Sequence, residues 1–282
     1  MNIGVFVHTG KPAALELAKQ VIRYLKGHSV DIWLDEQAAN ALGYPELIQT
    51  SEQLADVQVL IVLGGDGALL NAARLVSDFE IPILGVNVGH LGFLTELETE
   101  DIDSALAKLL LGDFTVEDRM FIDAQVIRNG EEIASCRALN DMVITRGTFA
   151  RIIRLSTYVD QQHVVDYFAD GIIVATPTGS TAYSLSAGGP IVEPLLPCLI
   201  ITPICPHTLA SRSVVVRPEA VVLLEVEASH EDVMLTIDGQ KGFPLHSCDQ
   251  VRIVQAEVKA KFVKLCGRDF FAILQNRLKN PR

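Results

Sequence analysis

The sequence has few features that would direct it to nucleic acid or to a membrane. Its 23 Lys and Arg are outnumbered by 35 Asp and Glu, which gives a formal charge of −12, and the basic residues form no run. Because an acidic surface repels phosphate backbones and anionic lipid headgroups, we expect neither nucleic acid nor a membrane as a partner. The longest apolar runs also fall well short of the ~18 residues of a membrane-spanning helix.

Cysteine is scarce as well. The five cysteines are odd in number and widely spaced, and no two of them form a C-x-x-C pair. This pattern favours reduced thiols over disulfides. The first residues lack the basic flank and the long apolar stretch of a signal peptide. Together these absences predict a cytoplasmic protein.

What the sequence does contain is a change of pattern near residue 118. Residues 1–118 alternate apolar runs with helical spacing, which predicts an α/β domain with a doubly wound, mostly parallel sheet. Residues 119–267 show alternating β-branched segments, which predict an all-β, antiparallel, sandwich-like second domain. Residues 268–282 have helical spacing, and we expect this helix to return to the first domain. Its predicted apolar face carries Phe271, Leu274 and Leu278.

Two dipeptides predict tight turns between strands. Asn129-Gly130 separates two alternating segments, and both residue types tolerate the positive φ that a two-residue hairpin requires. Asp238-Gly239 is interpreted in the same way, as a turn rather than as part of a site.

Familiar nucleotide-binding and hydrolase motifs are missing. Gly10-Lys11 has neither the correctly spaced glycine nor the following Ser or Thr of a P-loop, and Leu70 stands where a dinucleotide fingerprint has its third glycine. No G-x-S-x-G or H-E-x-x-H pattern is present. The chemistry must therefore depend on other residues.

The first candidate is Gly64-Gly65-Asp66-Gly67, between an apolar strand at Val57–Leu63 and a helix at Ala68–Val76. Glycines at this position permit positive φ and a close approach of backbone N–H groups to phosphate oxygens, and the helix N-terminus adds its positive dipole. A carboxylate repels phosphate, so Asp66 is interpreted as a proton acceptor from a hydroxyl or as an indirect holder of Mg²⁺.

The second candidate is the segment Thr176–Pro190, which concentrates hydroxyls and glycines directly after a strand. Small hydroxyl side chains and free N–H groups suit a phosphorylated or polyhydroxylated ligand. The alternative, a flexible linker, is disfavoured by Pro177 and Pro190. A third candidate, Asn140-Asp141, offers a donor, acceptors and a charge that suit an adenine edge or a ribose diol, although such a pair is also common in turns.

Taken together, Gly64–Gly67, Asn140-Asp141 and above all Thr176–Pro190 preceded by Asp170-Gly171 resemble the NAD kinase family of the bacterial type. The order and spacing of these segments agree along nearly the whole chain. Gly-Gly-Asp-Gly alone is less specific, because lipid kinases of the diacylglycerol kinase type and phosphofructokinases share it. A lipid or sugar kinase, and a non-catalytic dinucleotide sensor, therefore remain alternatives.

The resemblance implies transfer of a phosphoryl group from ATP, with Mg²⁺, to the 2′-hydroxyl of the adenosine ribose of NAD, giving NADP in the cleft between the two domains. It assigns Asp66 as the general base and implies a homodimer or homotetramer built through the β-rich domain. Polyphosphate stays open as a donor. The implied substrate-binding residues are Gly65, Gly67, Asn140, Asp141, Arg151, Asp170, Thr178, Thr181, Ala182, Tyr183, Ser186 and Gln240, and no protein metal ligand is implied.

Two positions depart from the pattern of the family. Asp141 stands where many relatives have Glu, and Phe168 stands where some relatives have a basic residue two positions before Asp170. The second departure leaves open whether NADH is accepted as well as NAD.

Overall fold

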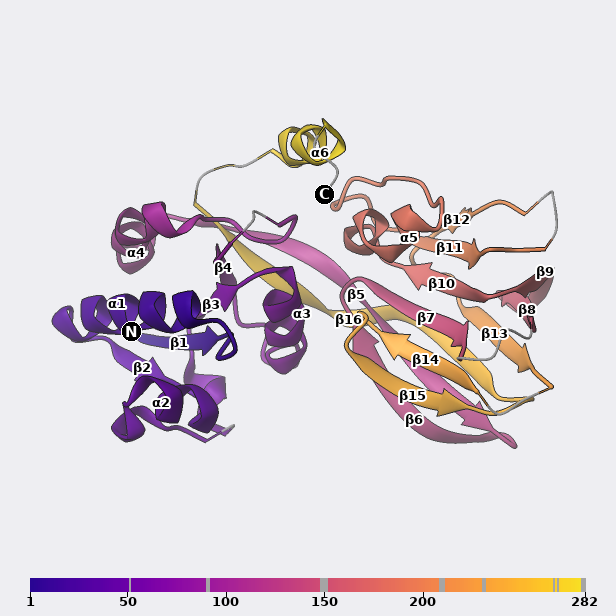
Figure 1. Ribbon diagram of the computed structural model, residues 1–282, viewed down its shortest axis with the longest axis horizontal. Coiled ribbons are helices and arrows are strands. Elements are labelled where there is room, and N and C mark those ends of the chain that lie inside the picture. The colour runs from indigo at the N-terminus through magenta and orange to yellow at the C-terminus, as the bar shows by residue number, and fades with distance from the viewer. Residues whose placement is uncertain are drawn as a thin grey trace. The chain divides into compact units, whose positions relative to one another are not determined.

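The computed structural model describes residues 1–50, 52–89, 92–147, 152–207, 211–229, 232–265, 267 and 269–279. The chain divides into two compact units (Figure 1), one formed by Met1–Asp118 with Ala260–Arg282 and the other by Arg119–Lys259. It passes from one unit to the other within β5 (Thr115–Arg128) and again within β16 (Gln250–Lys264).

The first unit is built on a parallel sheet with the strand order β2-β1-β3-β4. All six residues of β3 are buried, as is typical of a strand that is covered on both faces. Near the end of β16, Phe262 lies beside Ile83 of β4, also in parallel. The doubly wound, mostly parallel sheet that the sequence predicts is thus confirmed. The strands are β1 (Asn2–Val7), β2 (Asp31–Trp33), β3 (Val59–Gly64) and β4 (Ile83–Asn87).

Helices cover this sheet with their apolar faces. In α1 the buried residues recur at helical spacing from Ala14 to Leu25. The short helix α2 was not predicted; Asp35 starts it by accepting the N–H of Ala38 at 2.7 Å. The helices that cover the sheet are α1 (Pro12–Gly27), α2 (Glu36–Leu42), α3 (Asp66–Leu75) and α4 (Ile102–Leu111), with 3₁₀ turns η1 (Pro45–Leu47), η2 (Glu52–Asp56) and η3 (Thr99–Asp101). A further helix of this unit is α6 (Phe270–Lys279), and none of its described side chains is buried. No helix among the described residues is both long enough and apolar enough to cross a membrane.

The second unit contains two sheets packed over a shared core, which confirms the predicted antiparallel sandwich. One is the continuation, through β16, of the ten-stranded sheet that also contains β2-β1-β3-β4; its order here is β16-β13-β8-β9, with β5 paired to β16 and β6 paired to β5. The other has six strands in the order β12-β11-β10-β7-β14-β15. Strand β11 was not predicted. The remaining strands are β6 (Glu131–Ala138), β7 (Asp141–Arg146), β8 (Ile153–Val159), β9 (Gln162–Ala169), β10 (Gly171–Ala175), β11 (Leu199–Ile204), β12 (Val214–Val216), β13 (Val222–Glu227), β14 (Val233–Ile237) and β15 (Lys241–Leu245).

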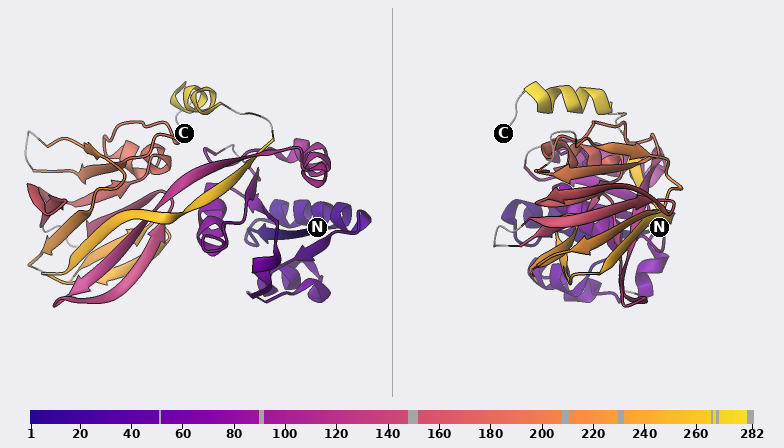
Figure 2. Two further views of the ribbon diagram at one scale, coloured as in Figure 1. Left: turned by 180° about the vertical axis from the view of Figure 1, so that it is seen from behind. Right: turned by 90° about the vertical axis from the view of Figure 1, so that its right-hand side faces the viewer.

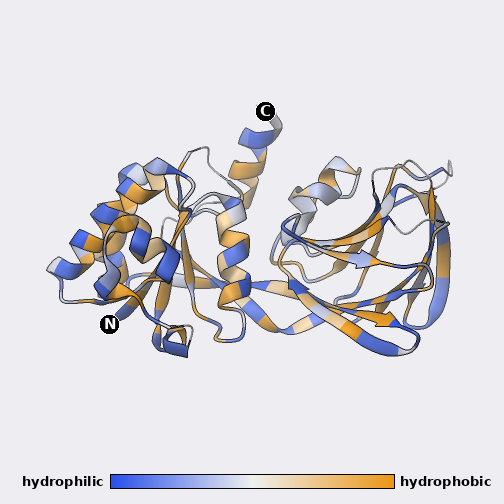
Figure 3. Ribbon diagram, turned by 60° about the horizontal axis from the view of Figure 1, so that its bottom comes forward, coloured by the Kyte–Doolittle hydropathy of each residue, from blue (hydrophilic) through white to orange (hydrophobic). Residues whose placement is uncertain are grey.

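Burial along these strands explains their sequence patterns. In β14 buried and half-buried residues alternate, because one face packs into the core and the other lies near the surface. All five residues of β10 are buried instead, since a second apolar cluster with Ile173 and Ile200 covers its other face. Figure 3 shows the result, with hydrophobic residues along the strands and helices that alternate between hydrophobic and hydrophilic faces.

Both predicted hairpin turns are present. Asn129 and Gly130 have φ values of 54° and 83°, and they join β5 to β6 in a long hairpin (Figure 2). Asp238 and Gly239, with φ values of 48° and 65°, join β14 to β15 in the same way. Two successive residues in the left-handed region match the twist of the flanking strands.

The predicted C-terminal helix is present as α6 and belongs to the first unit. The ring of Phe270 lies 6.4 Å from that of Phe93, measured between centroids. The prediction that Phe271 lies on the buried face is wrong, because its side chain is 58% exposed. The contact is made one residue earlier.

Candidate active site

In the first unit, the glycine-rich segment lies at the edge of the sheet where the parallel strands end. Strand β3 stops at Gly64, Gly65 is the N-cap residue of α3, and Asp66 and Gly67 occupy the first turn. The helix therefore begins two residues earlier than predicted. None of these glycines has a positive φ, so that part of the interpretation is wrong. At Gly64 the requirement is close approach, since an added Cβ would lie 2.6 Å from the Cβ of Ala68.

The Asp66 carboxylate is held by a loop that the sequence analysis did not single out. Its Oδ2 accepts the N–H of Phe93 at 2.9 Å, and its Oδ1 accepts the N–H of Leu94 at 3.1 Å. Gly92 must be glycine for this contact, because an added Cβ would lie 1.9 Å from Oδ1 of Asp66. The carboxylate is thus fixed in direction at the N-terminus of α3, where the helix dipole favours a negative charge.

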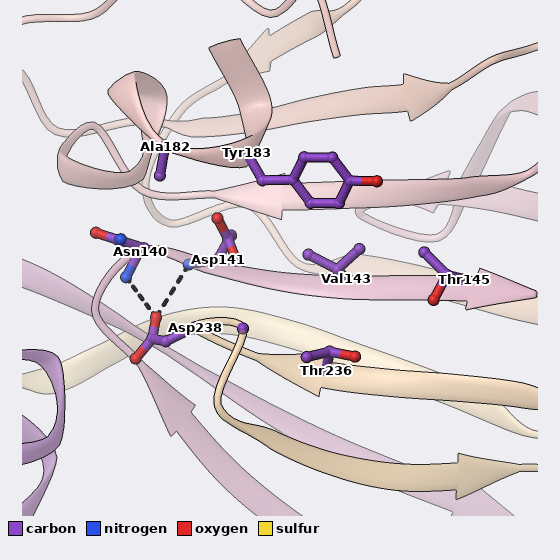
Figure 4. Close-up of a pocket in the computed structure, with 9 residues that line it drawn as sticks. Asn140, Asp141, Val143, Thr145, Ala182, Tyr183, Thr236 and Asp238 are labelled. Carbon is purple, nitrogen blue, oxygen red and sulfur yellow. Dashed lines mark hydrogen bonds between the residues drawn. The ribbon is translucent and has the colours of Figure 1, made fainter. Parts of the chain in front are cut away.

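In the second unit, a pocket of about 380 Å³ gathers several of the predicted residues (Figure 4). Strand β7 forms one side, the hairpin of β14 and β15 the second, and the start of α5 (Tyr183–Ser186) the third. Four predicted residues, Asn140, Asp141, Ala182 and Tyr183, line it together. The other lining residues are Val143, Thr145, Thr236, Asp238 and Gly239.

Asp238 is the main residue that sequence reasoning missed. Its carboxylate accepts three successive backbone N–H groups, those of Leu139 at 3.2 Å, Asn140 at 2.7 Å and Asp141 at 3.2 Å. In return, its own N–H donates to the carbonyl oxygen of Asp141 at 3.0 Å. The predicted turn at Asp238 is correct. The second role of Asp238, as the acceptor of the N–H groups at the start of β7, becomes visible only from the strand register, which sets Ile237 opposite Met142.

The segment after β10 closes against the same corner of the chain. The Thr176 hydroxyl donates to the carbonyl oxygen of Leu139 at 2.5 Å, and the Thr176 N–H donates to that of Asn140 at 2.9 Å. An added Cβ at Gly179 would lie 2.0 Å from the carbonyl oxygen of Asn140. Glycine is therefore required at this position for the turn to pack on β7. The segment is an ordered turn, η4 (Thr178–Thr181), followed by α5.

Most hydroxyls of this segment stabilise the turn and do not line the pocket. Ser180 both donates to and accepts from the backbone of Val192 at 3.1 Å. The Thr178 hydroxyl accepts a hydrogen bond from Arg119 at 3.3 Å, and that of Thr181 donates to the carbonyl oxygen of Thr178. Ser186 is exposed at the end of α5. Ala182 and Tyr183 are the two residues that this segment contributes to the pocket lining.

Two further predicted residues, Asp170 and Gln240, lie outside the lining. Asp170 accepts a hydrogen bond from Nε of Arg146 at 2.7 Å, and this bond holds the pKa of the Asp170 carboxyl below its usual range. Gln240 is exposed and directly follows Gly239 of the pocket. Arg151 lies outside the described residues. Within the described part of the chain, no group of three or more His, Cys, Asp or Glu is arranged to hold a metal ion.

Asp141 is the unusual acid of the pocket. Its side chain is 3% exposed, and in Figure 4 it points toward Ala182 and away from Asp238. Burial raises the pKa of the Asp141 carboxyl to about 7, and the nearby charge of Asp238 acts in the same direction. Near neutral pH this carboxyl is present in both protonation states, so it can donate as well as accept a hydrogen bond.

The raised pKa of Asp141 predicts a pH dependence of stability. A group whose pKa is higher in the folded chain stabilises it fully below about pH 4 and loses that contribution as the pH rises through about 7. Asp141→Asn removes this dependence, because the amide stays neutral. As the pH rises from 5 to 8, we expect the free energy of unfolding of the variant to increase relative to that of the wild-type chain by on the order of 3 kcal/mol. Urea unfolding at both pH values measures this gain, and an equal difference at the two pH values would contradict it.

Sequence comparison identifies relatives over the whole of this arrangement. The family described as ATP-NAD kinase N-terminal domain matches residues 3–114, and the family described as ATP-NAD kinase C-terminal domain matches residues 139–265. The NAD kinase of Thermoanaerobacter sp. (strain X514) is 45% identical over 278 residues, which cover 98% of each chain. That of Carboxydothermus hydrogenoformans is 47% identical over 237 residues, or 84% of this chain and 85% of its own.

Solved structures share the fold. An NAD kinase from Archaeoglobus fulgidus in complex with ATP superposes with a TM-score of 0.77 at 27% identity and covers 99% of both chains. Yeast NADH kinase complexed with NADH has a TM-score of 0.87 at 23% identity, covering 99% of this chain and 86% of its own. Because both family domains match and relatives at 45% identity span its length, the chain belongs to the ATP-NAD kinase family.

Proposed function

We propose that this chain transfers the terminal phosphoryl group of ATP to the 2′-hydroxyl of the adenosine ribose of NAD and so forms NADP. One observation carries the proposal: in a chain of this family, the Asp66 carboxylate is held in a fixed direction at the edge where the parallel strands end. Ligands bind at this edge in open α/β sheets. Phosphoryl transfer needs little more from the protein than positioning and charge stabilisation.

In the proposed reaction, Asp66 accepts the proton of the 2′-hydroxyl as the hydroxyl oxygen attacks the terminal phosphorus of ATP. The bond from that phosphorus to its bridging oxygen breaks, and ADP leaves. Gly65 and Gly67 flank Asp66 at the start of α3, and their backbone N–H groups are the proposed donors to phosphate oxygens, because a helix N-terminus favours anions. Magnesium bound to the phosphates of ATP, as part of that substrate, would neutralise their charge.

The pocket of the second unit is the proposed binding site for the dinucleotide. Its volume of about 380 Å³ is within the range of small-molecule sites. Asn140, Asp141 and Thr145 supply polar groups on one side, and the Tyr183 ring offers a stacking surface on the other. Further contacts along the bound substrate are proposed for Asp170, Thr178, Thr181, Ser186 and Gln240, which do not line the pocket, and for Arg151, which lies outside the described residues.

We further propose that the protein acts in the cytoplasm as a homodimer or homotetramer built through its β-rich unit. The net charge of −12 and the lack of a basic run disfavour nucleic acid and membranes as partners. Both observations are consistent with the proposed cytoplasmic location. Sedimentation at micromolar concentration tests the oligomeric state, and a monomer would contradict it.

The role of Asp66 predicts a loss of turnover in Asp66→Asn. The amide cannot accept the proton, so kcat is expected to fall by about 10²- to 10⁴-fold, while the affinity for NAD changes little. Asp56→Asn, an exposed acid of the same unit, is the matched control and should keep the full rate. Steady-state kinetics and NAD titration measure both quantities. Full activity in Asp66→Asn would remove Asp66 from the proposed role.

The choice of substrates is tested by a coupled assay of the unchanged chain. NAD and NADH serve as acceptors, and ATP and polyphosphate as donors, each pair with Mg²⁺. We expect NADP from NAD and ATP. Thermal stabilisation by NAD without any NADP formation, in the presence of either donor, would instead support a dinucleotide sensor.

A further inference from the structure

The loop that holds Asp66 is short and is itself held at its far end. It comprises Gly92–Glu96, named here the carboxylate loop. Phe93 and Leu94 donate their N–H groups to Asp66, and the Gly92 N–H donates to the Thr95 hydroxyl at 3.1 Å. The Glu96 N–H donates to the carbonyl oxygen of Gly85 in β4 at 2.9 Å. The backbone of the loop is therefore tied to the sheet at one point and to the Asp66 carboxylate at another.

The side chains of the carboxylate loop make a second set of contacts, with residues near the C-terminus. Glu96 is 2% exposed. Its carboxylate accepts the N–H of Leu265 at 3.0 Å and pairs with the ammonium group of Lys264. A buried carboxylate is stable only when it is paired and hydrogen-bonded, so the end of β16 and the carboxylate loop are firmly joined.

The third set of contacts involves helix α6. The Phe93 ring lies 6.4 Å from the ring of Phe270, and the guanidinium carbon of Arg277 lies 6.0 Å from the centre of the Phe93 ring. The backbone N–H of the same residue, Phe93, is bonded to Asp66. One residue thus joins α6 to the carboxylate that the proposed reaction uses.

We propose that Lys264, Leu265 and α6 position the Asp66 carboxylate through the carboxylate loop. The inference rests on the proposed function of Asp66. Loss of the contacts to Phe93 lets its N–H and that of Leu94 move, so that the carboxylate loses its fixed direction. A displacement of about 1 Å in a reacting group is enough to lower a rate by up to ~100-fold. None of these residues lines the dinucleotide pocket, so KM for NAD is unaffected.

The test uses the full chain with Phe270→Ala and Arg277→Ala combined. We expect kcat to fall about 10-fold, with KM for NAD within about twofold of its original value. Phe270→Tyr keeps the ring and should keep kcat. Gln275→Ala, an exposed position on the same helix, is the matched control and should also keep it. Glu96→Gln, which retains an acceptor for the Leu265 N–H but loses the ion pair, gives a second and independent perturbation of the loop.

A merely structural role for α6 is distinguished by combining these changes with Asp66→Asn. If α6 acts through Asp66, adding Phe270→Ala and Arg277→Ala to Asp66→Asn lowers the residual kcat of that variant by less than about twofold. An equal fold-loss with and without Asp66, or an unchanged kcat in the unchanged background, would overturn the proposal.

Amide hydrogen exchange supplies a readout that does not depend on turnover. The N–H groups of Phe93 and Leu94 should exchange faster in the combined Phe270 and Arg277 variant, while those of β3 keep their protection. Unchanged exchange at both residues would overturn the inference. Absence of NADP formation by the unchanged chain would instead refute the proposed function, so the two failures are separate.

Discussion

The pocket of the second unit depends on one buried carboxylate and on the three backbone N–H groups that donate hydrogen bonds to it. Asp238 is 8% exposed and takes hydrogen bonds from Leu139, Asn140 and Asp141 in succession. Hydrogen bonds to a charged acceptor away from water are strong, and loss of the acceptor leaves all three donors unsatisfied. The start of β7 is thereby fixed. The carbonyl oxygen of Asn140 can then receive the Thr176 N–H, and Gly179 can pack against it.

A pocket built in this way has its polar groups in place before a ligand arrives. The turn η4 is held by its own buried hydroxyls, and it presents Ala182 and Tyr183 opposite Asn140 and Asp141. The conformational entropy of these groups is lost when the chain folds and not when a ligand binds, which favours binding. In the first unit a carboxylate is likewise oriented in advance, since the backbone N–H groups of Phe93 and Leu94 donate to Asp66.

How much the sequence could predict depends on how local the determining contacts are. The parallel sheet, the sandwich and both hairpins follow from periodicity and turn chemistry along the chain. Strand β11 escaped prediction because Pro203 interrupts its apolar run. The start of α3 was misplaced because two glycines flank Asp66, and glycine is a poor indicator of helix.

Side-chain direction and long-range register could not be read from the sequence. The hydroxyls of Thr176 and Ser180 have the residue types of a ligand cradle, yet they satisfy backbone groups of the turn and its neighbours. Asp238 lies opposite Asp141 only through the pairing of β14 with β7, nearly 100 residues apart in the chain. Likewise, Phe270 and not Phe271 meets Phe93, a difference of one helical position that the apolar pattern does not resolve.

The most direct test of this account is calorimetric titration of NAD into Asp238→Ala, with Asp56→Asn as the control. The account predicts that the control binds normally and that Asp238→Ala binds NAD at least about 10-fold more weakly, with an unchanged far-ultraviolet circular dichroism spectrum, because the N–H groups of residues 139–141 lose their acceptor. Equal affinity for NAD in the two variants would contradict it.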